Sequence, residues 1–97
     1  MARGAILVVD DEPSILGTLK KALSLEGYSV DVAGGIKLAE ERLGKKAYDV
    51  VLLDVALPDG DGIELLAKLR EGGSDVAVIM MSGHATIGAA VRATRLG

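Results

Sequence analysis

The most informative stretch is Val50-Val51-Leu52-Leu53-Asp54, in which four branched apolar residues run directly into a carboxylate. An apolar run without polar alternation predicts a strand covered on both faces, as in a parallel sheet between helices. In open α/β sheets, ligands bind at the carboxyl ends of the strands. We therefore expect a central strand over residues 49–54, with Asp54 as a candidate site residue.

Two further apolar runs predict buried strands. Residues 5–9 end in Asp10-Asp11-Glu12, and residues 76–81 end at Ser82. Between them, apolar and polar residues alternate over residues 28–32, which is typical of a half-exposed strand at a sheet edge. Each buried strand is thus followed by a polar residue at its carboxyl end.

Helical patterns separate these strands. Pro13 fits the first turn of a helix over residues 13–26, which Gly27 ends. A second helix is expected over residues 36–44, and Asp61 caps a third that Gly72-Gly73 end. Apolar positions at helical spacing are expected to face the core. In the first helix these positions are Ile15, Leu16, Leu19, Ala22 and Leu23, and in the third they are Ile63, Leu66, Ala67 and Leu69. A last helix is expected to begin near Thr86. Strands alternating with helices predict a doubly wound parallel α/β sheet, in one domain over residues 1–97.

The composition excludes several function classes. The chain has no cysteine, which leaves no disulfide or thiolate zinc site and fits a cytoplasmic location. The net charge is −3 and no basic run is longer than Lys45-Lys46, so we expect no direct nucleic-acid binding. No apolar stretch is long enough to span a membrane.

The acidic residues at the strand ends predict a metal site. If the strands over residues 5–9 and 49–54 are neighbours, Asp10, Asp11 and Asp54 share one crevice. Two carboxylates ~5 Å apart repel by about 3 kcal/mol at an effective dielectric constant of 20. Either one acid is protonated or a hard divalent cation lies between them, and Mg²⁺ suits such an all-oxygen site best. Asp54 then becomes a nucleophile for a phosphoryl group, to which Ser82 can donate a hydrogen bond.

These residues carry a resemblance to a known family. Nearly the whole chain resembles the receiver domain of two-component response regulators, nearest to the nitrogen-regulator type that precedes a sigma-54-activating ATPase and a DNA-binding domain. The matching motifs are Val8-Val9-Asp10-Asp11-Glu12-Pro13, Leu53-Asp54-Val55-Ala56-Leu57-Pro58-Asp59-Gly60-Asp61-Gly62 and Met81-Ser82-Gly83-His84-Ala85-Thr86-Ile87.

The resemblance implies a fold, a site and partners. The fold is a flavodoxin-like receiver with strand order 2-1-3-4, counting strands along the chain. Asp54 is the phospho-acceptor, Asp10 and Asp11 hold Mg²⁺ with the Ala56 main-chain carbonyl, and Ser82 is the switch hydroxyl. A sensor histidine kinase donates the phosphoryl group, which shifts a homodimer or output-domain interface. The intact protein would then control transcription through an output domain.

The chain also departs from the family, because no residues match its fifth strand and helix, its phosphate-binding lysine or its switch aromatic. We therefore expect residues 76–81 to form an open apolar edge, and the isolated chain to lose stability and self-associate.

Three other functions remain in competition. A metal-dependent phosphohydrolase needs a second aspartate two residues after the nucleophile, where this chain has Ala56. A dinucleotide site needs a glycine-rich turn after the first strand, where Asp10-Asp11-Glu12 would repel pyrophosphate. A docking module that is never phosphorylated is disfavoured by the three aspartates but favoured by the missing fifth strand. Asp59 and Asp61 fit a turn and a cap better than a calcium loop, and His84 has no predicted chemistry.

Overall fold

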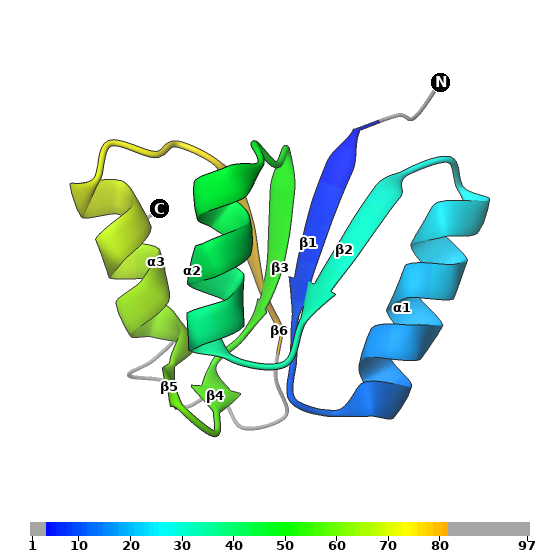
Figure 1. The fold of residues 1–97 in the computed structure, drawn as a ribbon, viewed down its shortest axis with the longest axis horizontal. Coiled ribbons are helices and arrows are strands. Elements are labelled where there is room, and N and C mark those ends of the chain that lie inside the picture. The colour runs from blue at the N-terminus through cyan, green and yellow to red at the C-terminus, as the bar shows by residue number, and fades with distance from the viewer. Residues whose placement is uncertain (1–3, 82–97) are drawn as a thin grey trace.

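The computed structural model of the chain describes residues 4–81. In this part of the chain, four parallel strands form a sheet in the order β2-β1-β3-β6 (Figure 1). They are β1 (Ala5–Val9), β2 (Ser29–Ala33), β3 (Val50–Asp54) and β6 (Ala77–Met81). Because β6 is the fourth of the predicted strands, the expected order 2-1-3-4 is confirmed, and β2 lies at an edge as predicted.

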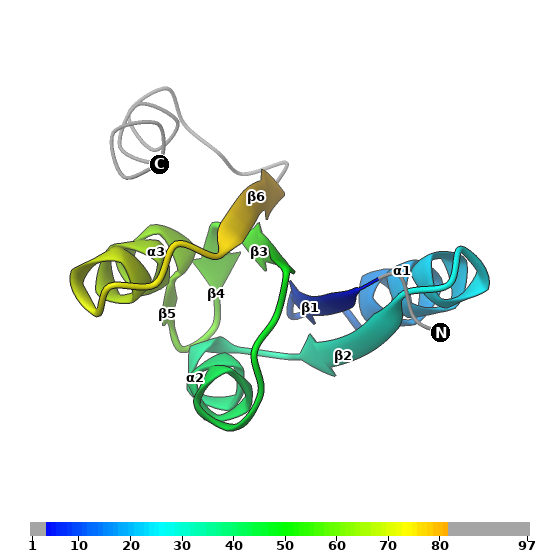
Figure 2. The same cartoon turned by 90° about the horizontal axis from the view of Figure 1, so that it is seen from above.

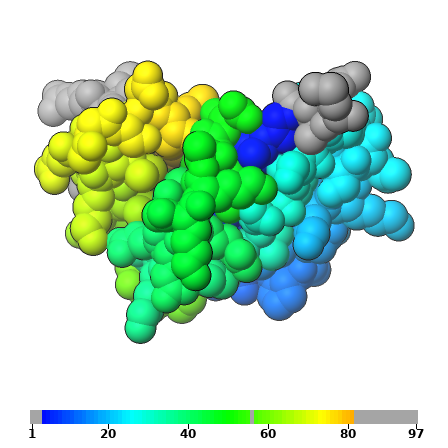
Figure 3. Space-filling model, turned by 45° about the horizontal axis from the view of Figure 1, so that its top comes forward, coloured from blue at the N-terminus to red at the C-terminus, as the bar shows by residue number. Residues whose placement is uncertain are grey.

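Within the described residues, three helices cover this sheet. They are α1 (Pro13–Leu25), α2 (Ile36–Lys45) and α3 (Gly62–Glu71). Figure 2 shows α2 and α3 on one side of the sheet and α1 on the other. The space-filling view shows α2 between α3 and the α1–β2 end of the molecule (Figure 3). The doubly wound α/β architecture is therefore confirmed.

The pleat of β1 divides the core into two clusters. Leu7 and Val9 point toward α2 and α3, whereas Ile6 and Val8 point toward α1. We call these two sides the α2/α3 face and the α1 face. The buried members of the α2/α3 face are Leu7, Val9, Ala33, Ala39, Tyr48, Val51, Leu53, Leu65 and Leu66, and those of the α1 face are Ile6, Val8 and Val30.

The helix ends follow the predicted signals. Pro13 is the first residue of α1, and Gly27 takes a positive φ of 96° after its end. The Asp61 side chain caps α3 by accepting a hydrogen bond of 2.8 Å from the Ile63 main-chain N–H. Gly72 is the C-cap of that helix, and Gly73 follows with φ 85°.

Three details of burial differ from the predictions. In α1, Ile15 and Ala22 are exposed, because only Leu16, Leu19 and Leu23 reach the sheet. In α3, Leu65 is buried although the helical pattern did not select it. In β6, Ala77 and Ile79 are exposed, so this strand is not buried on both faces. Within residues 4–81, β6 is the outermost strand on its side of the sheet.

The sequence analysis missed a small antiparallel hairpin after β3. It consists of β4 (Ala56–Leu57) and β5 (Gly60–Asp61), in the segment where only a turn was expected. Ser82, His84 and the helix predicted from Thr86 lie outside the described residues.

Candidate metal centre

The sheet brings three predicted site residues together. Strands β1 and β3 are neighbours in parallel register, with Val9 opposite Leu53. Asp10 directly follows β1 and Asp54 is the last residue of β3, so both carboxylates lie at the same edge. Carboxylate oxygens of Asp10, Asp11 and Asp54 lie within 4.8 Å of one another.

The three carboxylates differ in their access to solvent. Asp10 and Asp54 are buried, at 5% and 6% exposure, whereas Asp11 is exposed. A ligand at this cluster would therefore rest on two buried carboxylates and meet water on the side of Asp11.

Main-chain contacts hold Asp10 between β2 and α1. Its N–H donates to the Ala33 carbonyl at 3.1 Å, and its Oδ1 accepts from the Glu12 N–H at 2.9 Å. Glu12 is the N-cap of α1 and makes no side-chain cap, so the Asp10 carboxylate satisfies an N–H at the start of the helix.

A close turn follows Asp54 on the other side of the site. The Gly62 N–H donates to the Val55 carbonyl at 2.7 Å, which closes the base of the β4–β5 hairpin. A Cβ atom on Gly62 would collide with the Asp54 main-chain oxygen. Glycine is therefore required where the first turn of α3 passes the end of β3.

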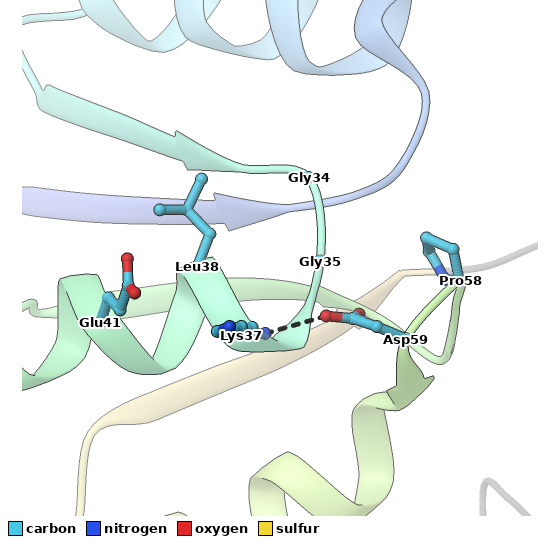
Figure 4. Close-up of a pocket in the computed structure, with 7 residues that line it drawn as sticks. All are labelled: Gly34, Gly35, Lys37, Leu38, Glu41, Pro58 and Asp59. Carbon is cyan, nitrogen blue, oxygen red and sulfur yellow. Dashed lines mark hydrogen bonds between the residues drawn. The ribbon is translucent and has the colours of Figure 1, made fainter.

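The tip of this hairpin is tied to α2. Asp59 accepts hydrogen bonds from the main-chain N–H groups of Ile36 at 2.7 Å and Lys37 at 3.1 Å. The bond from Ile36 makes the larger contribution and that from Lys37 the next, and together they hold the pKa of the Asp59 carboxyl below its usual value. Figure 4 shows Asp59 directed at the start of α2, beside a pocket of about 410 Å³ that Lys37, Leu38, Glu41 and Pro58 help to line.

The sequence analysis gave Asp59 only a role in a turn. One signal pointed further: the residues before α2 are Gly34 and Gly35, which offer no capping side chain. The first N–H groups of that helix therefore need an acceptor from elsewhere in the chain.

The donor set fits a hard divalent cation. Three carboxylates within 4.8 Å supply only oxygen ligands, and at that separation each pair repels by about 3 kcal/mol at an effective dielectric constant of 20. A cation relieves this repulsion, and Mg²⁺ accepts such ligands together with waters. Ala56, the fourth predicted ligand, lies in β4, two residues beyond Asp54.

The chain belongs to the response regulator receiver domain family, whose sequence profile matches residues 6–97. It is therefore a receiver domain of a two-component system. It is 37% identical over 95 residues to the alginate biosynthesis transcriptional regulatory protein AlgB of Pseudomonas putida, covering 98% of this chain and 21% of that protein. It is 35% identical to the regulatory protein AtoC of Escherichia coli, covering 95% of this chain and 20% of that protein.

Solved structures show the same fold. The beryllofluoride-activated NtrC4 receiver domain dimer matches with a TM-score of 0.87 and 39% identity, covering 96% of this chain and 77% of that one. NtrX from Brucella abortus matches with a TM-score of 0.87 and 36% identity, covering 100% of this chain and 22% of that one. The predicted family, its nitrogen-regulator relatives and the receiver fold are thus confirmed.

The chain spans about a fifth of the length of the AlgB and AtoC relatives. Within residues 4–81, every helix is too short or too polar to cross a membrane.

Proposed function

We propose that Asp54 is the phospho-acceptor of this receiver domain. The observation that carries the proposal is the convergence of the Asp10, Asp11 and Asp54 carboxylates at the carboxyl end of two neighbouring strands. Asp54 ends the inner strand β3 and is held in a buried position, from which a carboxylate oxygen can attack one phosphorus atom in a fixed direction.

The proposed reaction is a phosphoryl transfer from a sensor histidine kinase. A carboxylate oxygen of Asp54 forms a bond to phosphorus while the bond between phosphorus and the histidine nitrogen of the kinase breaks. The nitrogen keeps the electron pair, the ring takes up one proton from solvent to become neutral imidazole, and Asp54 becomes an acyl phosphate. The domain catalyses this step and the later hydrolysis on itself alone.

Asp10, Asp11, Asp54 and the Ala56 main-chain carbonyl are the proposed ligands of Mg²⁺. When bound, the cation would neutralise negative charge on the carboxylates and on the transferring oxygens. Asp10 contributes by its rigidity, because main-chain contacts fix both its backbone and its carboxylate.

Ser82 is the proposed switch hydroxyl, which would donate a hydrogen bond to the phosphoryl group. We propose that the resulting shift alters a homodimer or output-domain interface in the cytoplasm and thereby controls transcription. The relatives AlgB and AtoC are named as regulators, and the NtrC4 receiver domain forms a dimer, which supports this output. DNA binding would then belong to an output domain.

Intact-mass spectrometry after incubation with acetyl phosphate and Mg²⁺ tests the proposal. We expect the wild-type chain to gain one phosphoryl group, and Asp54→Asn or metal-free samples to gain none. Asp75→Asn is the control. It removes an exposed carboxylate that precedes the amino end of β6, at the opposite end of the sheet from Asp54, and should leave the gain of one phosphoryl group unchanged. A folded wild-type chain that gains no mass would contradict the proposal and favour a docking module.

A further inference from the structure

The β4–β5 hairpin contains Ala56 and connects the end of β3 to the start of α3. It is anchored at two points. We propose that Asp59 is a positioning residue that fixes the Ala56 main-chain carbonyl and thereby sets the affinity of the site for Mg²⁺. This inference rests on the proposed function, because it assumes that Ala56 is a metal ligand.

The first anchor lies at the base of the hairpin. Gly62 donates its N–H to the Val55 carbonyl at 2.7 Å, and Ala56 pairs with Asp61 across the two short strands. This base holds the ends of the hairpin together. A two-stranded hairpin of this length is not stable alone, so its orientation must be fixed by contacts elsewhere.

The second anchor lies at the tip and is provided by Asp59. Both of its carboxylate oxygens accept main-chain N–H groups of the first turn of α2, at 2.7 Å from Ile36 and 3.1 Å from Lys37. Figure 4 shows the second of these bonds. A negative charge is favoured at this positive end of the helix. The two bonds therefore restrain both the distance and the direction between the hairpin and α2.

The packing around this anchor leaves no space for larger residues. A Cβ atom on Gly35 would lie 2.7 Å from Asp59 Oδ1, and one on Gly60 would lie 3.1 Å from the Ile36 Cγ1 atom. Two glycines thus let the hairpin and the start of α2 approach closely enough for the carboxylate to bridge them.

Asp59 acts on the metal centre only through this geometry. Among the described residues, the cluster of carboxylates that could hold a metal ion consists of Asp10, Asp11 and Asp54, and Asp59 is not part of it. Ala56 lies between the anchored base and the anchored tip. Without the tip anchor, the position of its carbonyl would no longer be fixed, and a metal ion bound by it would be held less tightly.

Calorimetric titration with MgCl₂ tests this inference without any phosphorylation step. We expect Asp59→Ala to raise the Mg²⁺ Kd about tenfold, the lower range for loss of a residue that orients a ligand. Asp59→Asn keeps one acceptor oxygen and should therefore retain most of the wild-type affinity for Mg²⁺. Gly35→Ala keeps the charge but displaces the carboxylate, so it should also raise the Kd. Asp75→Ala, which removes an exposed carboxylate far from the hairpin, should leave it unchanged.

Circular dichroism and thermal melting identify the variants that are folded at the temperature of the titration. A folded Asp59→Ala with a wild-type Kd, whatever its Tm, would overturn the inference, because Asp59 would then be only structural. If Asp59→Ala does not fold, Gly35→Ala decides by the same criterion. If the wild type neither binds Mg²⁺ nor is phosphorylated, the proposed function fails and the inference with it. If the wild type does both, an unchanged Kd overturns the inference alone.

Discussion

The two faces of the sheet differ in how completely their side chains are buried. On the α2/α3 face, Val51 and Leu53 of β3 are fully buried. On the α1 face, Val50 and Leu52 of the same strand are only partly buried. Helix α1 has no buried residue, and Ile79 of β6 is 54% exposed.

This difference shows that an apolar run in the sequence does not by itself predict how deeply each of its residues is buried. Neighbouring residues of β3 have equal apolarity, but the helices that cover each face determine how much surface leaves water. In residues 4–81, two helices pack on one face and one on the other. The candidate metal centre lies at the carboxyl ends of β1 and β3. The α2/α3 side of β3 is fully buried.

The largest expected effect tests the difference in burial between the two faces, with a matched pair of substitutions in β3. Leu53→Ala should lower the free energy of unfolding by about 3 to 4 kcal/mol, because it leaves a cavity in a fully packed site. Leu52→Ala should cost about 1 to 2 kcal/mol, since its partly exposed side chain has less contact to lose. Urea unfolding followed by circular dichroism gives both values. Equal losses would mean that the two faces are equally buried in solution.

A pair of glycine substitutions compares the helices themselves. Gly62→Ala in α3 should cost about 1 to 3 kcal/mol, because its Cβ collides with the Asp54 main-chain oxygen. Gly17→Ala in α1 should instead stabilise the protein by about 0.5 to 1 kcal/mol, since nothing lies within 4 Å of that Cβ and alanine favours a helix. Thermal melting distinguishes the two signs. A loss with Gly17→Ala would contradict the loose packing of α1.

The last prediction, with the smallest expected loss of stability, concerns a hydrogen bond made by Tyr48, a residue of the α2/α3 face. The Tyr48 hydroxyl donates to Asp31 Oδ2 at 2.6 Å. Burial and then the Asp31 carboxylate raise the pKa of Tyr48 to about 12, while the bond from Tyr48 lowers the pKa of Asp31. Tyr48→Phe should therefore cost about 1 kcal/mol near neutral pH.

The pH dependence of this cost follows from the two pKa shifts. The raised pKa of Tyr48 makes its contribution complete below about pH 10 and lost as pH rises through about 12. The lowered pKa of Asp31 makes its contribution complete above the unfolded value near 3.9 and lost as pH falls further. Urea unfolding of wild type and Tyr48→Phe across pH should show their difference shrinking at both extremes. A difference that is constant with pH would rule out this pair as its source.

Local signals were sufficient to predict most of the fold. The apolar runs located the strands within one residue at each end, and Pro13, Gly27 and Asp61 marked helix ends correctly. The hairpin of Ala56–Leu57 with Gly60–Asp61 was missed because two-residue strands have no periodic pattern. Leu65 was missed because α3 packs over a wider face than a narrow helical stripe.

The candidate site was predictable to a similar degree. Carboxylates at the ends of apolar runs indicated Asp10, Asp11 and Asp54, since parallel strands carry their carboxyl ends to one edge. The clamp of Asp59 on α2 was not predictable in this way. It joins residues 22 and 23 positions apart in the chain, which no local pattern encodes.

The sequence by itself determined the alternation of strands and helices and the acidic residues at the strand ends, because both follow from local chemistry. Only the tertiary structure decided which face of each strand is covered, how Gly62 passes Asp54, and that Asp59 ties the site hairpin to α2. These features depend on contacts between segments distant in the chain, whose geometry is set by packing rather than by the properties of any one residue.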